Sequence, residues 1–163
     1  MPRFETTRRV PYSAEQMFAI VADIEKYPQF LPMCESLKVT SRKDDGVTTH
    51  VVATMGIGYK AIQESFTTRV VLSPKASPPL IEVAYLDGPF HHLDNRWRFT
   101  DRENGSDIHF FIDYQFRSAM LGLVMGTVFD KAFRKFAEAF EDRARQVYGP
   151  LGRVGAESSG SKA

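Results

Sequence analysis

Residues 108–116 read IHFFIDYQF, a run in which apolar side chains occupy every second position. Ile108, Phe110, Ile112, Tyr114 and Phe116 share one face if this segment is extended, because successive side chains of a β-strand point to opposite sides. The alternation therefore predicts a strand with one buried face.

Directly after this strand the hydrophobic period becomes that of a helix. Beyond Ser118, apolar residues recur three, four and seven positions apart, with charged residues between them, as far as Gly149-Pro150. This pattern predicts a long amphipathic helix that ends at Gly149. Its apolar stripe consists of Phe129, Phe133, Phe136, Phe140 and Val147.

Upstream of the strand, the chain alternates between short runs and turn residues. Residues 3–10 predict a first strand, and Ser13 is the expected N-cap of a short helix. Pro28 and Pro32 restrict residues 23–34 to one or two short helical turns. From residue 37 the runs predict about six strands, and hairpin turns are expected at 44–46, 56–58 and 104–105, with further strands over 81–86 and 95–100.

This order of elements predicts an α+β helix-grip fold. We expect a curved antiparallel sheet of about seven strands around the C-terminal helix, with two short helices after the first strand. The domain should cover residues 1–149. Residues 150–163 are rich in Gly, Ser and Ala and have nothing to bury, so a disordered tail is expected there.

Composition limits the partners of the chain. A formal net charge of +1 over 163 residues gives no long-range attraction to nucleic acid, so direct DNA binding is not expected. The single cysteine, Cys34, excludes an intramolecular disulfide. Without a signal-peptide pattern or an apolar stretch of about 20 residues, the chain is expected in the cytoplasm, either free or peripheral to the inner face of a membrane.

The usual catalytic and metal-binding patterns are missing from the sequence. The four histidines, at positions 50, 91, 92 and 109, lack the helical or Cys/His spacing of metal sites, and the glycine-rich nucleotide motifs and the serine hydrolase motif do not occur. We therefore expect no metal, no catalytic residue and no cofactor, and we interpret the chain as a binding protein rather than an enzyme.

The abundant apolar side chains predict either a filled core or the lining of a hydrophobic cavity. The residues expected to line such a cavity are Phe30, Leu31, Val83, Tyr85, Phe90, Trp97, Phe99, Phe110, Ile112, Tyr114, Leu123, Val124 and Phe129. Tyr85 or Tyr114 is the expected hydrogen-bond donor to a ligand, since a phenol carries one polar group on an apolar ring.

The start of the long helix is apolar on nearly all sides, although one packed face requires only a stripe. Part of this segment is therefore expected to meet something other than water: a ligand or a membrane surface, for which the segment would act as a gate, or a partner such as a second copy of the chain. The residues concerned are Met120, Leu121, Leu123, Val124 and Met125.

Two motifs resemble a known family. Residues 27–34 match a Y-P-x-F-L-P-x-C pattern, and residues 88–99 match G-P-F-x-x-L-x-x-x-W-x-F. Both resemble the coenzyme Q-binding branch of the START-like, polyketide cyclase-related (SRPBCC) superfamily, and the likeness extends over nearly all of residues 1–150.

The resemblance implies a lipid chaperone that holds ubiquinone or a related polyprenyl lipid and supports respiration or quinone biosynthesis. The same branch contains ribosome association toxins, which implies, as an alternative, a regulator that binds the large ribosomal subunit. Related folds also host cyclases and hydrolase-like enzymes, which is a third alternative.

Overall fold

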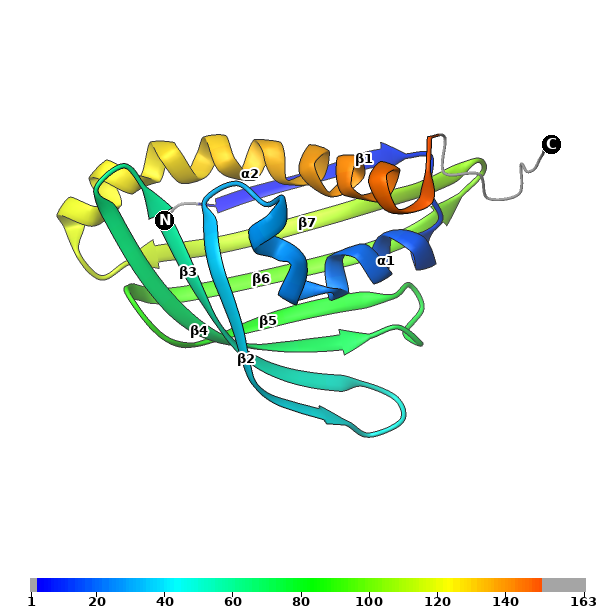
Figure 1. Cartoon of the computed structure of the whole chain (residues 1–163), viewed down its shortest axis with the longest axis horizontal. Coiled ribbons are helices and arrows are strands. Elements are labelled where there is room, and N and C mark those ends of the chain that lie inside the picture. Colours follow the sequence, from blue (N-terminus) through cyan, green and yellow to red (C-terminus); the bar gives the residue numbers. More distant parts are fainter. Residues whose placement is uncertain (1–2, 151–163) are drawn as a thin grey trace.

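The computed structural model describes residues 3–150, which form one sheet with its covering helices (Figure 1). The order of elements is the predicted one, including the two short helices after the first strand. In chain order they are β1 (Arg3–Val10), α1 (Ala14–Ala22), the 3₁₀ helix η1 (Ile24–Gln29), β2 (Cys34–Asp44), β3 (Thr49–Tyr59), β4 (Ile62–Ser73), β5 (Leu80–Asp87), β6 (Phe90–Arg102), β7 (Gly105–Phe116) and α2 (Ala119–Tyr148).

The strands form a seven-stranded antiparallel sheet in the order β1-β7-β6-β5-β4-β3-β2. Figure 1 shows that this sheet is strongly curved and that α2 runs lengthwise across its hollow side. The predicted helix-grip fold is thereby confirmed. The tail predicted for 150–163 falls, apart from Pro150, outside the described residues.

Local chemistry places the ends of several elements where the sequence predicted them. The Ser13 side chain accepts a hydrogen bond from Gln16 N, and the Gln16 side chain accepts one from Ser13 N, a reciprocal capping box that begins α1. In the β2–β3 turn, the Asp45 carboxylate accepts hydrogen bonds from the backbone of Val47 and Thr48. Asn104, with φ of 66°, makes the β6–β7 turn.

The turn predicted at 56–58 is wrong, because Gly56 and Gly58 lie inside β3 and the chain reverses at Lys60-Ala61. These glycines allow β2 to approach β3 closely, rather than forming a turn. β2 bulges between Cys34 and Ser36, and a Cβ at Gly56 would lie 2.3 Å from the Ser36 Oγ. Gly58 N also donates to the Met33 carbonyl at 3.0 Å.

The strand predicted over 95–100 also begins earlier than expected. β6 starts at Phe90, directly after Gly88-Pro89, and a bulge between Phe90 and His92 separates its first residues from the regular alternation. The bulge hides the period of two on which the sequence prediction depended.

The last turns of α2 are fixed to the N-terminal part of the chain. The Tyr12 hydroxyl donates to the Gly149 carbonyl at 2.8 Å, and the Tyr148 hydroxyl donates to the Gln16 carbonyl at 3.0 Å. Arg8 of β1 also pairs with Glu141 at 2.9 Å. These contacts anchor the C-terminal end of α2, whereas its first turns have no comparable polar attachment to β1 or α1 among the described residues.

Gly105 offers a test of this packing. A Cβ at Gly105 would lie 2.0 Å from the Val10 carbonyl oxygen, and its φ of +156° disfavours other residues. We expect Gly105→Ala to lower the free energy of unfolding by at least ~2 kcal/mol, since it combines backbone strain with a steric clash.

Gly46→Ala is the matched control, because Gly46 also has a positive φ but nothing lies within 4 Å of a Cβ there. It should cost only about 1–2 kcal/mol. Chemical denaturation of both variants measures the difference, and equal costs would contradict the predicted clash.

Candidate functional site

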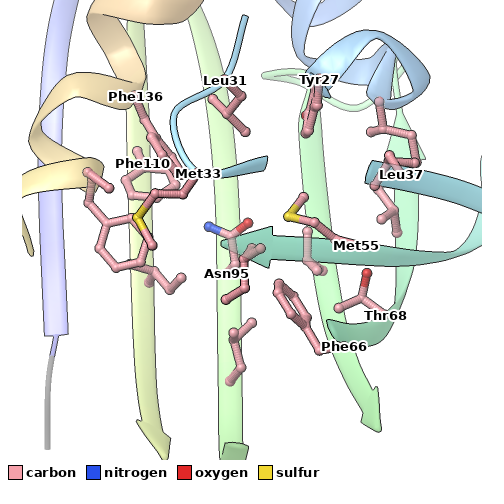
Figure 2. A pocket seen from close by; sticks show the side chains of 18 of the residues that line it. Tyr27, Leu31, Met33, Leu37, Met55, Phe66, Thr68, Asn95, Phe110 and Phe136 are labelled. Carbon is pink, nitrogen blue, oxygen red and sulfur yellow. The ribbon is translucent and has the colours of Figure 1, made fainter. Parts of the chain in front are cut away.

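A cavity of about 130 Å³ lies between the hollow side of the sheet and α2, under the segment that joins η1 to β2. Its walls come from η1, from the segment that joins η1 to β2, from β2 to β7 and from α2 (Figure 2). The lining residues are Ile24, Tyr27, Leu31, Pro32, Met33, Leu37, Ala53, Met55, Ile57, Phe66, Thr68, Val70, Ile81, Val83, Phe90, Leu93, Asn95, Trp97, Phe110, Ile112, Phe129, Ala132, Phe133, Phe136 and Phe140.

The lining is almost entirely apolar and contains no charged side chain or histidine. Its polar side chains, other than the Tyr27 phenol, are Thr68 and Asn95. Asn95 is occupied by the protein, since its amide donates to the Phe111 carbonyl at 2.8 Å and accepts from the Trp97 indole at 3.2 Å. The hydroxyl of Thr68 makes no hydrogen bond within the described part of the chain. Thr68 is therefore the polar group available to a ligand.

Rigid aromatic rings hold the cavity open. Trp97 packs edge-on against Phe110 and Phe140, at centroid distances of 4.6 and 5.1 Å. Phe129 packs against Phe116 at 5.3 Å on another part of the helix. Because these rings cannot bend, they set the spacing between α2 and the sheet.

Two methionines make part of the wall adaptable. Met33 and Met55 are half-buried, and Figure 2 shows them on either side of Asn95. Methionine has three rotatable bonds and a polarisable sulfur, so it accommodates ligands of different shape at low cost. Met33 also has a left-handed φ of 69°. The η1–β2 segment thus combines a flexible side chain with a restrained backbone.

Burial raises the pKa values of three titratable groups near the cavity. It raises the pKa of the Cys34 thiol to about 11 and that of the Tyr114 phenol to about 12, and nearby Asp130 adds to the effect on Tyr114. Burial likewise raises the pKa of Tyr27, whose hydroxyl donates to the Val21 carbonyl. These groups are neutral at physiological pH, so the site offers shape and apolar surface rather than charge.

The structure brings together about half of the residues predicted to line a cavity. Those in the lining are Leu31, Val83, Phe90, Trp97, Phe110, Ile112 and Phe129. Those placed outside it are Phe30, Tyr85, Phe99, Tyr114, Leu123 and Val124.

Packing explains most of the residues that lie outside. Phe99 packs against Phe18 of α1, and Tyr114 packs against Phe129 and Phe133 of α2. The Tyr85 hydroxyl already accepts the Phe90 N–H at 3.0 Å. Phe30 packs on Phe140 at the rim of the site. Tyr85 and Tyr114, the predicted hydrogen-bond donors, lie outside the lining, whereas Thr68 lies within it.

The predicted gate segment divides into two sides. Met120, Leu123 and Val124 are exposed, at 76%, 83% and 48%, whereas Leu121 is half-buried and Met125 is buried. Leu123 and Val124 fall outside the cavity because they point away from the sheet. The part of the gate prediction that concerns Met125 is wrong, since this side chain belongs to the core.

The opposite wall was missed by the sequence prediction. Leu37, Met55, Phe66 and Thr68 lie on β2, β3 and β4, which reach the cavity because the sheet curls. Their alternation along the strands marked an inward face, but nothing in the sequence gave the curvature that brings this face opposite α2.

Other polar groups do not assemble into a recognisable centre. His92 pairs with Asp113 at 3.0 Å and His109 with Glu5 at 2.6 Å, at positions that do not line the cavity. Among residues 3–150 there is no group of three or more His, Cys, Asp or Glu side chains suited to a metal ion. The same residues include no helix long and apolar enough to cross a membrane.

An apolar cavity between a curved antiparallel sheet and a long C-terminal helix is the architecture of the START-like proteins. The model of the family described as "Polyketide cyclase / dehydrase and lipid transport" matches residues 10–141. The chain belongs to this family.

Two relatives that are similar in sequence have different names. The ribosome association toxin RatA of Escherichia coli (strain K12) is 35% identical, over 91% of this chain and 90% of its own length. The mitochondrial coenzyme Q-binding protein COQ10 of Dictyostelium discoideum is 28% identical, over 89% of this chain and 70% of its own.

Solved structures agree on the fold. An 18 kDa protein of Caulobacter crescentus has 34% identity and a TM-score of 0.76, over 91% of this chain and 99% of that chain. The Zhui aromatase/cyclase of Streptomyces sp. R1128 has 18% identity and a TM-score of 0.74, over 89% and 94% of the two chains, and shows the fold alone. By name, the RatA relative is a toxin and the COQ10 relative is a binding protein.

Cys34 gives a test of the burial described above. A pKa of about 11, against an ordinary value of 9.0, leaves roughly 100-fold less thiolate near neutral pH. We expect the folded protein to react with an aromatic disulfide reagent at about pH 8 at least ~100-fold more slowly than the denatured chain. The chain has a single cysteine, so the denatured protein is its own control. Equal rates would contradict the burial of this thiol.

Proposed function

We propose that this protein binds ubiquinone or a related polyprenyl lipid and acts as its chaperone, without catalysing a reaction. The observation that carries the proposal is the cavity: it is apolar, rimmed by adaptable methionines and supplied with one free hydroxyl, that of Thr68. A quinone has complementary chemistry, because it combines a flat ring with carbonyl oxygens that accept hydrogen bonds. The COQ10 relative, a coenzyme Q-binding protein by name, supports the same choice.

The size of the cavity defines how much of such a ligand it holds. A volume of about 130 Å³ is close to the ~150 Å³ of an engineered apolar cavity that binds benzene, and below the ~300–1,000 Å³ of typical ligand pockets. At this volume the cavity therefore holds about one six-membered ring. A substituted quinone requires Met33 and Met55 to move aside, and its isoprenoid tail extends outside, where each methylene-sized group needs about 0.8 kcal/mol of apolar contact.

Trp97 provides a direct measurement, because it lines the cavity and is the single tryptophan of the chain. We expect decylubiquinone, a soluble short-tailed analogue, to quench its fluorescence saturably. Ala53→Leu adds three carbon atoms inside the cavity, so it should weaken binding at least tenfold.

Ala84→Leu is the matched control, since Ala84 is exposed on the same sheet and does not line the cavity. It should bind like the unmodified protein, and circular dichroism should show that both variants are folded. If quenching is not saturable, and lipid extraction of the purified protein yields no isoprenoid quinone, the proposal fails.

Thr68 has an expected role of its own. Thr68→Val keeps the shape of the side chain but removes the hydroxyl. The binding free energy should therefore lose the net contribution of one hydrogen bond. We expect decylubiquinone affinity to fall by about fivefold, which corresponds to ~1 kcal/mol. Thr67→Val is the control, because Thr67 neighbours Thr68 on β4 but does not line the cavity. An unchanged affinity in Thr68→Val would remove this residue from the site.

A second function is favoured by the names of several relatives. Ribosome association toxins match at up to 35% identity over about nine-tenths of both chains, against 28% for COQ10. A regulator that binds the large ribosomal subunit is therefore the alternative. A purified protein that contains no quinone but co-sediments with large subunits supports this alternative and rejects the first proposal.

A further inference from the structure

Exposed apolar side chains gather at one end of the molecule. Within residues 3–150, seven large hydrophobic side chains are exposed: Val47, Tyr59, Leu86, Met120, Leu123, Val124 and Val147. Five of them belong to three segments: the β3–β4 turn (Tyr59), the end of β5 (Leu86) and the first turns of α2 (Met120, Leu123, Val124). Val47 and Val147 lie elsewhere, in the β2–β3 turn and near the end of α2.

Strand pairing shows that these three segments share one end of the sheet. Phe90, which opens β6, is opposite Phe116, which closes β7, so the β5–β6 turn lies beside the start of α2. Arg117 N donates to the Pro89 carbonyl at 2.9 Å and fixes this contact. The β3–β4 turn points the same way, since Thr67 in the middle of β4 pairs with Asp87 at the end of β5, and the first half of β4 runs on past this pair to the turn. Figure 1 shows all three turns at its left side.

The same end adjoins the cavity. Phe116, which is separated from α2 by two residues, contacts two residues of the cavity lining: Phe90 stacks on it at 4.6 Å, and the tilted ring of Phe129 packs on it at 5.3 Å. Gly88 of the β5–β6 turn lies against Phe66, another lining residue, so closely that a Cβ there would be 2.5 Å from the Phe66 Cβ. A surface that contacts these turns is therefore adjacent to the space in which the ligand is held.

Basic side chains flank this apolar end. On α2, Met120, Val124, Lys131 and Lys135 recur at spacings of four and seven, so the exposed face is apolar at first and basic two turns later. Lys60 lies next to Tyr59, and Arg117 precedes α2. In the described part of the chain no carboxylate lies within ion-pair distance of Lys60, Arg117, Lys131 or Lys135. The Arg117 Nε already donates to the Phe90 carbonyl at 2.9 Å, and the Lys60 Nζ lies 5.4 Å above the Tyr59 ring. The ammonium groups of Lys60, Lys131 and Lys135 can meet lipid phosphates.

We propose that this end, formed by the β3–β4 turn, the β5–β6 turn and the first turns of α2, docks on an anionic phospholipid bilayer. Apolar side chains that enter the interface beside unpaired lysines are the combination that binds such surfaces. The inference deepens the proposed function, on which it rests for the identity of the cargo. Docking places the cavity next to the membrane in which an isoprenoid lipid dissolves.

Vesicle flotation of the purified full-length protein tests the inference without any added ligand. We expect the protein to float with phosphatidylcholine vesicles that contain phosphatidylglycerol, and at least tenfold less with phosphatidylcholine alone. High salt should release it, because screening weakens contacts between exposed charges.

Leu86→Asp and Leu123→Asp should each reduce flotation at least tenfold, whereas Val47→Asp and Val147→Asp, equally exposed but elsewhere, should have no effect. Circular dichroism verifies the fold of all four variants. Flotation that is absent in the unmodified protein, or equally reduced by Val47→Asp, overturns the inference. The inference is also overturned if the unmodified protein does not float but forms dimers that Leu123→Asp converts to monomers. That result would assign the surface to contact with a second copy.

The two proposals fail separately. Leu86→Asp should lose flotation but keep quenching of Trp97 by decylubiquinone, since Leu86 does not line the cavity. Ala53→Leu should show the reverse. A protein that floats but binds no quinone rejects the proposed function alone, and one that binds quinone in solution but does not float rejects the docking inference alone.

Discussion

The separation between α2 and the sheet is maintained by aromatic contacts, and the site depends on it. Phe140 rests on Trp97 at 5.1 Å, and Phe129 on Phe116 at 5.3 Å. Rings of this size do not compress, so the helix cannot settle closer to the strands between these contacts. The space left there is the cavity. Shorter aliphatic side chains at the same places would allow the layers to close and would leave an ordinary core.

The residues that line that space say more about function than the architecture does. A common fold supports different functions, so function has to be argued from the lining. Here the lining has no charged group, and Asn95 is already bonded to Phe111 and Trp97. A ligand in this space would be selected by its shape and by a hydrogen bond to the Thr68 hydroxyl, while Met33 and Met55 would give the shape some tolerance.

Much of the fold could be predicted because local chemistry and tertiary packing agree. The alternation over 108–116, the cap at Ser13 and the stop at Gly149 each have a local cause. The glycines at 56 and 58 misled the prediction, since their purpose is contact with a bulged neighbour strand. The site was half predictable: the β6, β7 and α2 walls follow from periodicity, but the Leu37, Met55 and Phe66 wall depends on how far the sheet curls, which no residue pattern encodes.

The hydrogen bonds of Tyr12 and Tyr148 fix the C-terminal end of α2. Thirty residues at 1.5 Å each give a rod of about 45 Å. Its other end is held as well, because α2 follows β7 after only two residues and Arg117 N donates to the Pro89 carbonyl at 2.9 Å. A rod held at both ends can separate from the sheet only by bending between them, so any widening of the space beside Phe129 would leave the contacts around Gly149 intact.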